Sequence, residues 1–175
     1  MDQIIDQAIR KVPDFPKPGI LFYDITGLIT EPPAYQHVIN RMRELYQNYQ
    51  FDAVAAVESR GFLFAAPFAL ERKIPLILIR KAGKLPNKTI KKDFELEYGS
   101  GTLELQPIDV PKGANILLID DLLATGGTLK AAAELLEEAG GRVGEIFCVV
   151  GLPFLHPEKK LQGRNYTTLI DYHSE

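Results

Sequence analysis

Cysteine, histidine and tryptophan are scarce in this chain. Its 175 residues include no tryptophan and one cysteine, Cys148, so no internal disulfide can form. The three histidines, His37, His156 and His173, are scattered without the spacing of metal ligands. The first residues also lack the basic start and the apolar stretch of a signal peptide. We therefore expect a cytoplasmic protein that needs no disulfide or metal framework.

Long apolar runs and an excess of basic residues are absent too. The longest apolar runs, such as residues 116–119, are far too short to span a bilayer. Twenty Lys and Arg residues stand against 23 Asp and Glu residues, a net charge of -3, whereas duplex binding needs a basic surface. The sequence therefore predicts neither a membrane nor a nucleic acid as partner, and its length predicts one domain.

Apolar runs alternate with helical patterns along most of the chain. Strands that are apolar throughout are covered on both faces, which is typical of an open parallel sheet with helices on both sides. We therefore predict the α/β class. The predicted strands are residues 53–57, 75–79, 114–119, 144–151 and 166–170, and the predicted helices are residues 2–11, 34–48, 62–70 and 129–139.

Two segments do not fit this alternation. Residues 13–33 contain five prolines around the apolar residues 20–23, which predicts an ordered but irregular segment that shapes a pocket wall. Residues 82–113 are polar and rich in glycine, and their apolar side chains alternate around residues 99–101 as in a hairpin or lid. An insertion of that length usually has a function.

Residues 116–128 carry the strongest functional signal. Two carboxylates, Asp120 and Asp121, follow an apolar strand and could accept hydrogen bonds from sugar hydroxyls at the sheet's carboxyl edge. The next loop enters a helix, where backbone N–H groups and threonine hydroxyls can converge on a phosphate. Its candidate phosphate-binding residues are Ala124, Thr125, Gly126, Gly127 and Thr128. The two parts together predict a ribose 5-phosphate site.

Each part of this motif also has a plainer interpretation. The two aspartates alone could form a helix N-cap, and residues 125–128 alone could form a tight turn. Directly after four apolar residues, however, the combination favours the phosphate site. Neither G-x-x-x-x-G-K-S/T nor a G-x-G-x-x-G that opens a helix after a strand is present, which disfavours a P-loop NTPase and a dinucleotide-binding domain.

Five segments of the chain form an ordered set: PDFPKPG at 13–19, ESRGF at 58–62, RKAGKLP at 80–86, LEYG at 96–99 and DDLLATGGT at 120–128. They resemble segments of the adenine phosphoribosyltransferases, within the type I phosphoribosyltransferase family. They occur in the order typical of that family, and together they span most of the chain.

The resemblance implies a fold and a reaction. The expected fold is an N-terminal hood, residues 1–33, over a core of residues 34–175 with a five-stranded parallel sheet and a flexible loop or hairpin at about 82–105. The expected reaction joins adenine to 5-phosphoribosyl-1-pyrophosphate and gives AMP and pyrophosphate, as in purine salvage. Mg²⁺ is the implied cofactor, held mainly by the substrate rather than directly by the protein, and a homodimer is the implied assembly.

Cations are needed where pyrophosphate leaves, because negative charge develops there. Arg60, Lys81 and Lys84 are the candidates, since a guanidinium binds phosphate oxygens with directed hydrogen bonds and lysines act as point charges. The resemblance adds Ser59 and Arg80, the latter reaching across the dimer. The plainer alternative for any single lysine is a solvated surface position.

The base requires an acid and a stacking surface. Adenine attacks through N9, and a carboxylic acid on a closing loop can hydrogen-bond N7; the resemblance assigns this role to Glu97, which would otherwise be an exposed hairpin carboxylate. We expect Phe22 to stack on the purine, unless it belongs to the core, and the backbone of Leu21 and Tyr23 to read its edge. The family often has Arg where Tyr23 stands and Gly where Ala65 stands.

Three other functions remain open from the sequence. A 6-oxopurine phosphoribosyltransferase would share the phosphate loop, but a lysine that reads O6 is not found. A regulator that senses 5-phosphoribosyl-1-pyrophosphate and binds nucleic acid is disfavoured by the negative net charge and by the lack of an added helix-turn-helix. An inactive phosphate site is disfavoured because Arg60, Lys84, Glu97 and the acidic loop are all present.

Overall fold

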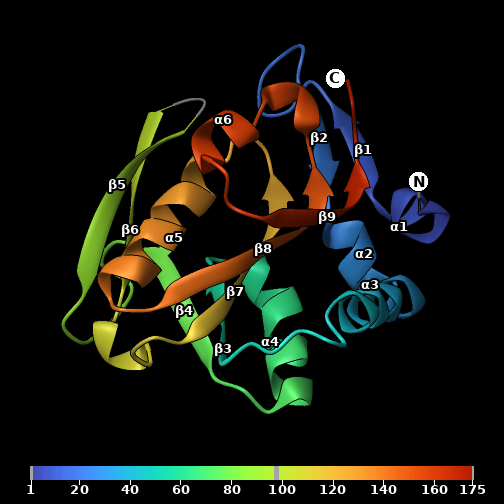
Figure 1. Ribbon diagram of the computed structural model, residues 1–175. Helices are drawn as coiled ribbons and strands as arrows, with labels where there is room; N and C mark the ends of the chain where they lie inside the picture. The colour runs from blue at the N-terminus through green and yellow to red at the C-terminus, as the bar shows by residue number, and fades with distance from the viewer. Residues whose placement is uncertain (1, 97–98, 175) are drawn as a thin grey trace.

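The computed structural model describes residues 2–96 and 99–174, and within them a mostly parallel sheet forms the centre of the molecule (Figure 1). The sheet has seven strands in the order β5-β6-β4-β3-β7-β8-β9. Strands β4, β3, β7, β8 and β9 run parallel, which confirms the predicted α/β class. Their bounds are Leu76–Lys81, Ala53–Val57, Asn115–Leu123, Arg142–Gly151 and Tyr166–Asp171.

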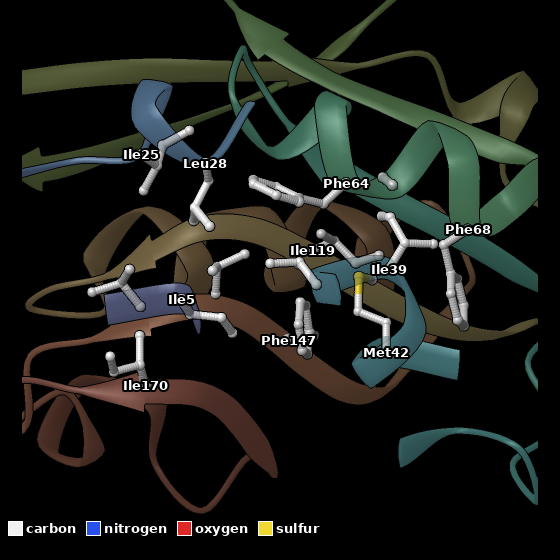
Figure 2. Close-up of a cluster of buried hydrophobic side chains, with 14 of the residues drawn as sticks. Ile5, Ile25, Leu28, Ile39, Met42, Phe64, Phe68, Ile119, Phe147 and Ile170 are labelled. Carbon is white, nitrogen blue, oxygen red and sulfur yellow. The ribbon is translucent and has the colours of Figure 1, made fainter. Parts of the chain in front are cut away.

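Both faces of the parallel strands are buried, as their apolar composition predicts. Along β7, Leu117 and Ile119 face one hydrophobic cluster, while Ile116 and Leu118 face the other. Figure 2 shows the first cluster, where Ile119 and Phe147 of the sheet lie with side chains from α3 and α4. The period-two alternation of side chains therefore divides one apolar sequence between two cores.

Helices cover the two faces unequally. α3 and α4 pack against the first cluster with α1 and α2, and α5 packs with α6 against the second. No helix in the described part of the chain is long and apolar enough to cross a membrane. The bounds, from α1 to α6, are Gln3–Ala8, Thr26–Thr30, Pro32–Leu45, Gly61–Arg72, Gly127–Glu138 and Glu158–Leu161, with short 3-10 helices at Pro107–Asp109 and Pro153–Leu155.

The N-terminal segment is more regular than the sequence predicts. The predicted helix over residues 2–11 ends at Ala8, because strand β1 (Arg10–Pro13) pairs with strand β2 (Leu21–Asp24). The segment 13–33, predicted as irregular, thus contributes to two strands and contains α2. Ile5, Ile25 and Leu28 are fully buried in the first cluster, and the two-stranded sheet lies beside the C-terminal strand β9 (Figure 1).

The insertion between β4 and β7 forms the hairpin that its alternating pattern predicts. Strand β5 (Ile90–Leu96) pairs antiparallel with β6 (Gly99–Leu105), and β6 also pairs with β4 (Figure 1). Phe94 lies opposite Gly101, where a Cβ would come within 2.8 Å of the Phe94 ring. The absence of a side chain at Gly101 therefore lets the Phe94 ring pack across the neighbouring strand.

Candidate functional site

A cavity of about 580 Å³ lies at the carboxyl ends of β3 and β7, where open parallel sheets bind ligands. Its walls come from the end of β3 and the loop after it, the end of β7 and the loop after it, the first turn of α5, the end of β4, and the hairpin. The lining residues are Val57, Glu58, Ser59, Arg60, Lys81, Phe94, Leu103, Asp120, Asp121, Leu122, Ala124, Thr125, Gly126, Gly127, Thr128 and Leu129.

The predicted phosphate loop lies in this cavity as one continuous wall. Residues 124–126 connect β7 to α5, and α5 begins at Gly127. Gly126 has φ +82, and a Cβ there would lie 3.1 Å from the Pro157 carbonyl oxygen, so both the backbone conformation and the packing require glycine. The arrangement presents a helix N-terminus to the cavity, which suits a phosphate group.

The two predicted aspartates have different surroundings. Asp121 is buried and its Oδ2 lies 2.8 Å from Nε of Arg60. Asp120 is 9% exposed and its Oδ1 accepts a 2.9 Å hydrogen bond from the Asp121 N–H. Burial raises the pKa of Asp120 well above its ordinary value of 3.8, and the Asp121 carboxylate raises it further. The pair therefore offers one ion-paired acceptor and one carboxyl that favours its protonated form.

The loop after β3 approaches the acid pair closely. The Glu58-Ser59 peptide in this loop is cis. A Cβ on Gly61 would lie 2.9 Å from the Ile119 carbonyl oxygen and 3.1 Å from Cα and Oδ1 of Asp120. Sequence reasoning does not select Gly61 and misses this packing role. A glycine directly after Arg60 is the one sequence signal that points to it.

Of the predicted cations on and after β4, Lys81 lines the cavity and Arg80 and Lys84 do not. Arg80 Nε lies 3.0 Å from Oε2 of Glu58, and the same oxygen accepts a 3.0 Å hydrogen bond from the Lys81 N–H. Burial raises the pKa of Glu58, but these hydrogen bonds outweigh it and hold the pKa below its ordinary value. Glu58, which sequence reasoning leaves without a role, thus fixes the segment that carries the cations.

The predicted base-binding residues lie on β2, next to the Arg60 side chain. The Phe22 ring centroid is 5.9 Å from Cζ of Arg60 and 5.0 Å from the Phe15 ring, and the Phe22 side chain is partly exposed. Tyr23 is 6% exposed and its ring stacks on Tyr172 at 4.0 Å, so its side chain belongs to the core. Leu21, Phe22 and Tyr23 are not among the residues that line the 580 Å³ cavity.

Glu97, the predicted acid, lies outside the described residues. Phe94 of β5 lines the cavity, although sequence reasoning does not select it.

The cavity offers a cation the adjacent side chains of Asp120 and Asp121, but not a cluster of three or more ligands in the described residues. In residues 2–96 and 99–174, no group of three or more His, Cys, Asp or Glu side chains is placed to hold a metal ion. Mg²⁺ in nucleotide sites is commonly bound by one or two carboxylates together with substrate oxygens, so the chemistry of Asp120 and Asp121 suits such a shared site.

Comparisons with known proteins agree with this geometry. Residues 26–171 match the model of the phosphoribosyl transferase domain. An adenine phosphoribosyltransferase of Treponema denticola is 55% identical over 174 residues, covering 99% of this chain and 92% of that protein. The crystal structure of adenine phosphoribosyltransferase from Thermoanaerobacter pseudethanolicus is 42% identical with a TM-score of 0.92, covering 96% of this chain and 98% of that one.

A second solved structure gives the same answer with ligands present. Adenine phosphoribosyltransferase from Saccharomyces cerevisiae, complexed with an imino-altritol bisphosphate and adenine, is 36% identical with a TM-score of 0.89, covering 96% of this chain and 97% of that one. A family model and full-length relatives therefore converge. The chain belongs to the phosphoribosyltransferase family, within the group formed by the adenine phosphoribosyltransferases.

Proposed function

We propose that this chain transfers the 5-phosphoribosyl group of 5-phosphoribosyl-1-pyrophosphate to N9 of adenine, giving AMP and pyrophosphate in purine salvage. The observation that carries the proposal is one cavity that joins a buried acid pair to a glycine-formed phosphate loop. The relatives named above supply the base, since those enzymes are adenine phosphoribosyltransferases and one was solved with adenine.

The ribose phosphate has a place for each of its polar groups. Residues 124–128 would bind the 5-phosphate through backbone N–H groups and the threonine hydroxyls. Asp120 and Asp121 would hydrogen-bond the ribose hydroxyls, which requires Arg60 to share or release Asp121. Ser59, Arg60 and Lys81 would then face the pyrophosphate, because they line the same cavity.

The chemical step exchanges two bonds at C1′ of the ribose. The C1′–O bond breaks and its electron pair leaves with pyrophosphate, while N9 of adenine donates the pair for the C1′–N9 bond and passes its proton to an oxygen of the leaving pyrophosphate or to water. Positive charge develops on the ribose and negative charge on the leaving group. Fixed cations therefore lower the activation barrier only if they lie next to the pyrophosphate. Arg60 and Lys81 would supply that charge, with Arg80 and Lys84 as further candidates.

The base would lie between Arg60 and the two-stranded sheet of β1 and β2. Phe22 offers a ring face near the Arg60 guanidinium, which suits stacking of a purine. Because the Tyr23 side chain is turned into the core, we propose that residues 21 and 23 read adenine through backbone groups. The tyrosine in place of the more usual arginine would then leave base specificity intact.

Glu97 is proposed as the acid that hydrogen-bonds N7 of adenine. Glu97→Ala should lower kcat by about 100-fold, the effect typical of losing a general acid, and leave AMP affinity within a factor of about two. Steady-state kinetics and calorimetric titration with AMP separate these effects. Glu95→Ala, a carboxylate on the same hairpin, is the matched control; weakened AMP binding with normal turnover in Glu97→Ala would exclude the role.

Mg²⁺ is proposed as the cofactor, bound mainly by diphosphate and ribose oxygens of the substrate. Among the acidic residues that line the cavity, Asp120 and Asp121 could share it, Asp120 only after losing its proton. When bound, the ion neutralises charge on the leaving pyrophosphate. Turnover should therefore vanish with a chelator and return with added Mg²⁺.

We also propose a homodimer in the cytoplasm. Leu63 and Leu70 of α4 are 38% and 81% exposed and lie seven residues apart, on one side of the helix. Leu78 of β4 is 37% exposed, and apolar surface of this kind favours a partner. A cytoplasmic location suits a polyanionic substrate that does not cross bilayers. Analytical ultracentrifugation tests the dimer, with Leu70→Lys as the variant expected to dissociate it.

The direct test measures pyrophosphate release with Mg²⁺ and 5-phosphoribosyl-1-pyrophosphate, offering adenine, hypoxanthine, guanine and xanthine separately. Turnover with adenine alone is the expected result. Turnover only with an oxopurine would replace the base assignment, and no turnover with any base would favour a sensor of 5-phosphoribosyl-1-pyrophosphate.

A further inference from the structure

The turn that follows β4 is held by one buried carboxylate. Glu104, on the middle strand of the β5-β6-β4 group, is 2% exposed. Its Oε1 accepts hydrogen bonds of 2.8 Å from the Lys84 N–H and 3.0 Å from the Leu85 N–H. Its Oε2 accepts one of 3.3 Å from the Thr89 hydroxyl and lies 3.8 Å from Nζ of Lys91.

A carboxylate at this position is costly, because burying a charge loses its hydration. The neighbours Leu103 and Leu105 are buried apolar residues that face the core under α5, whereas Glu104 points to the opposite face of β6, where the turn lies. Burial raises the pKa of Glu104, but hydrogen bonds from Leu85, Gly83 and Lys84 N–H groups outweigh it and hold the pKa below its ordinary value. The charge is thus retained and holds the backbone of the turn.

The same turn carries the cations proposed for pyrophosphate. Lys81 ends β4 and lines the cavity, and the Lys84 carbonyl accepts a 3.2 Å hydrogen bond from Arg80. Glu58 holds the Lys81 N–H at one end of this segment, and Glu104 holds the Lys84 and Leu85 N–H groups at the other. The segment is therefore fixed at both ends by carboxylates, in addition to the pairing of β4 with β6 and the 3.0 Å hydrogen bond from the Ala82 N–H to the Thr102 carbonyl.

We propose that Glu104 is a positioning residue for the pyrophosphate-binding turn: its carboxylate sets the backbone of residues 83–85 and so the reach of Lys81 and Lys84 toward the substrate. It does not touch substrate itself. The inference rests on the proposed function, since it assigns the turn to the pyrophosphate end of 5-phosphoribosyl-1-pyrophosphate. The hydrogen bonds from the backbone N–H groups of residues 84 and 85 to Glu104 do not depend on any substrate.

The test compares two variants of Glu104 with a matched control. Glu104→Met keeps the length of the side chain and removes both acceptors, and should raise KM for 5-phosphoribosyl-1-pyrophosphate by about tenfold, because misplacing binding groups by about 1 Å costs up to about 100-fold. KM for adenine should stay within a factor of about two. Glu104→Asp keeps the charge, but its shorter side chain places the carboxylate farther from the turn. It should raise KM for 5-phosphoribosyl-1-pyrophosphate by about threefold.

Glu145 supplies the control, since it is also a buried glutamate of the sheet and accepts a 2.8 Å hydrogen bond from Thr167, remote from the cavity. Glu145→Met should lower thermal stability without changing either KM. Hydrogen exchange of the peptide that contains residues 83–85 should accelerate in Glu104→Met and not in Glu145→Met.

The outcomes separate the two ideas. Stability losses in Glu104→Met and Glu104→Asp with an unchanged KM for 5-phosphoribosyl-1-pyrophosphate, or equal rises of both KM values, would overturn the positioning role. If Glu104→Met does not fold, Glu104→Asp against Glu145→Asp gives the same comparison. A wild-type chain without turnover would instead refute the proposed function, and calorimetric titration with pyrophosphate would then decide the role of Glu104.

Discussion

The two ends of the proposed substrate site are built in different ways. At the phosphate end, backbone groups of separate loops lie so close together that glycine is required at Gly61 and Gly126. At the base end, strand β2 is attached to the rest of the molecule through side chains: Tyr23 stacks on Tyr172 and donates a 3.1 Å hydrogen bond to the Ser174 carbonyl. Tyr172 in turn donates a 2.7 Å hydrogen bond to Asp6.

This difference has a physical consequence for each end. Backbone packed on backbone has no rotamer with which to relax, so the phosphate end should tolerate almost no added volume. Side-chain contacts can be weakened one at a time, so the base end should respond to substitution in small steps. Substitutions at the first end should therefore damage binding of 5-phosphoribosyl-1-pyrophosphate, and those at the second should alter adenine binding.

The largest effect is expected from Gly61→Ala. Its new Cβ would lie 2.9 Å from the Ile119 carbonyl oxygen, so the loop after β3 must move away from Asp120. We expect kcat/KM to fall by about 100-fold, the cost of a displacement of about 1 Å, and unfolding free energy to fall by about 1–3 kcal/mol. Steady-state kinetics and denaturant titration measure the two quantities.

Gly113→Ala is the control, because Gly113 has φ +73 and a Cβ added there would meet no atom within 4 Å outside the adjoining residues. It should cost about 1 kcal/mol of stability through backbone strain and leave kcat/KM unchanged. Equal loss of activity in both variants would remove the distinction between packed and merely strained glycines.

Asp121→Asn should have the next largest effect. The amide cannot balance the charge of Arg60, whose Nε lies 2.8 Å from Asp121, and it is a weaker acceptor for ribose hydroxyls. We expect KM for 5-phosphoribosyl-1-pyrophosphate to rise about tenfold, equivalent to losing about one charged hydrogen bond, with KM for adenine unchanged. Glu137→Gln, at the Arg164 ion pair outside the cavity, should change neither KM; a normal KM in Asp121→Asn would contradict the ribose-binding role.

The phosphate end could be predicted because its signal is contiguous in the sequence. Strand β7, which carries the acid pair near its carboxyl end, is followed directly by the phosphate loop within residues 115–128, so one pattern specifies all three. Strands β3, β4, β7 and β8 were predictable for a similar reason, since each contains a continuous apolar run of at least four residues.

The base end and the supporting carboxylates depend on pairings that no local pattern contains. Strand β1 exists because Arg10 pairs opposite Asp24, and Tyr23 is buried by a residue almost at the other end of the chain, Tyr172. Glu58 and Glu104 accept hydrogen bonds from backbone N–H groups about twenty residues away in the sequence, and a single glutamate gives no sequence signal for such a contact. Prolines in residues 13–33 therefore suggested irregular structure where tertiary pairing produces strands.

Tyr172→Leu tests the base end and should act more gently. Losing the stack on Tyr23 removes about 1 kcal/mol of the interaction energy that holds β2 in place, so KM for adenine should rise about fivefold as β2 shifts. KM for 5-phosphoribosyl-1-pyrophosphate should stay within a factor of about two. Tyr172→Phe keeps the stack and loses only the hydrogen bond to Asp6, so its adenine KM should be nearly normal. Parallel rises of both KM values in Tyr172→Leu would show that the two ends are not independent.

The smallest effect concerns Asp6, which connects α1 to Lys11 of β1 and to Tyr172, the residue directly after β9. A 2.9 Å hydrogen bond from Lys11 and the one from Tyr172 lower the pKa of Asp6 below its ordinary value of 3.8. A carboxyl whose pKa is lower in the folded state stabilises the protein above its unfolded pKa, and this contribution is lost as pH falls through the folded pKa. Between about pH 6 and about pH 3, the wild-type chain should therefore lose slightly more unfolding free energy than Asp6→Asn, as urea titrations at each pH would measure. Identical pH profiles would mean that the carboxylate contributes nothing to the attachment of the N-terminal segment, which would then rest on its buried apolar side chains and on the stacking of Tyr23 on Tyr172.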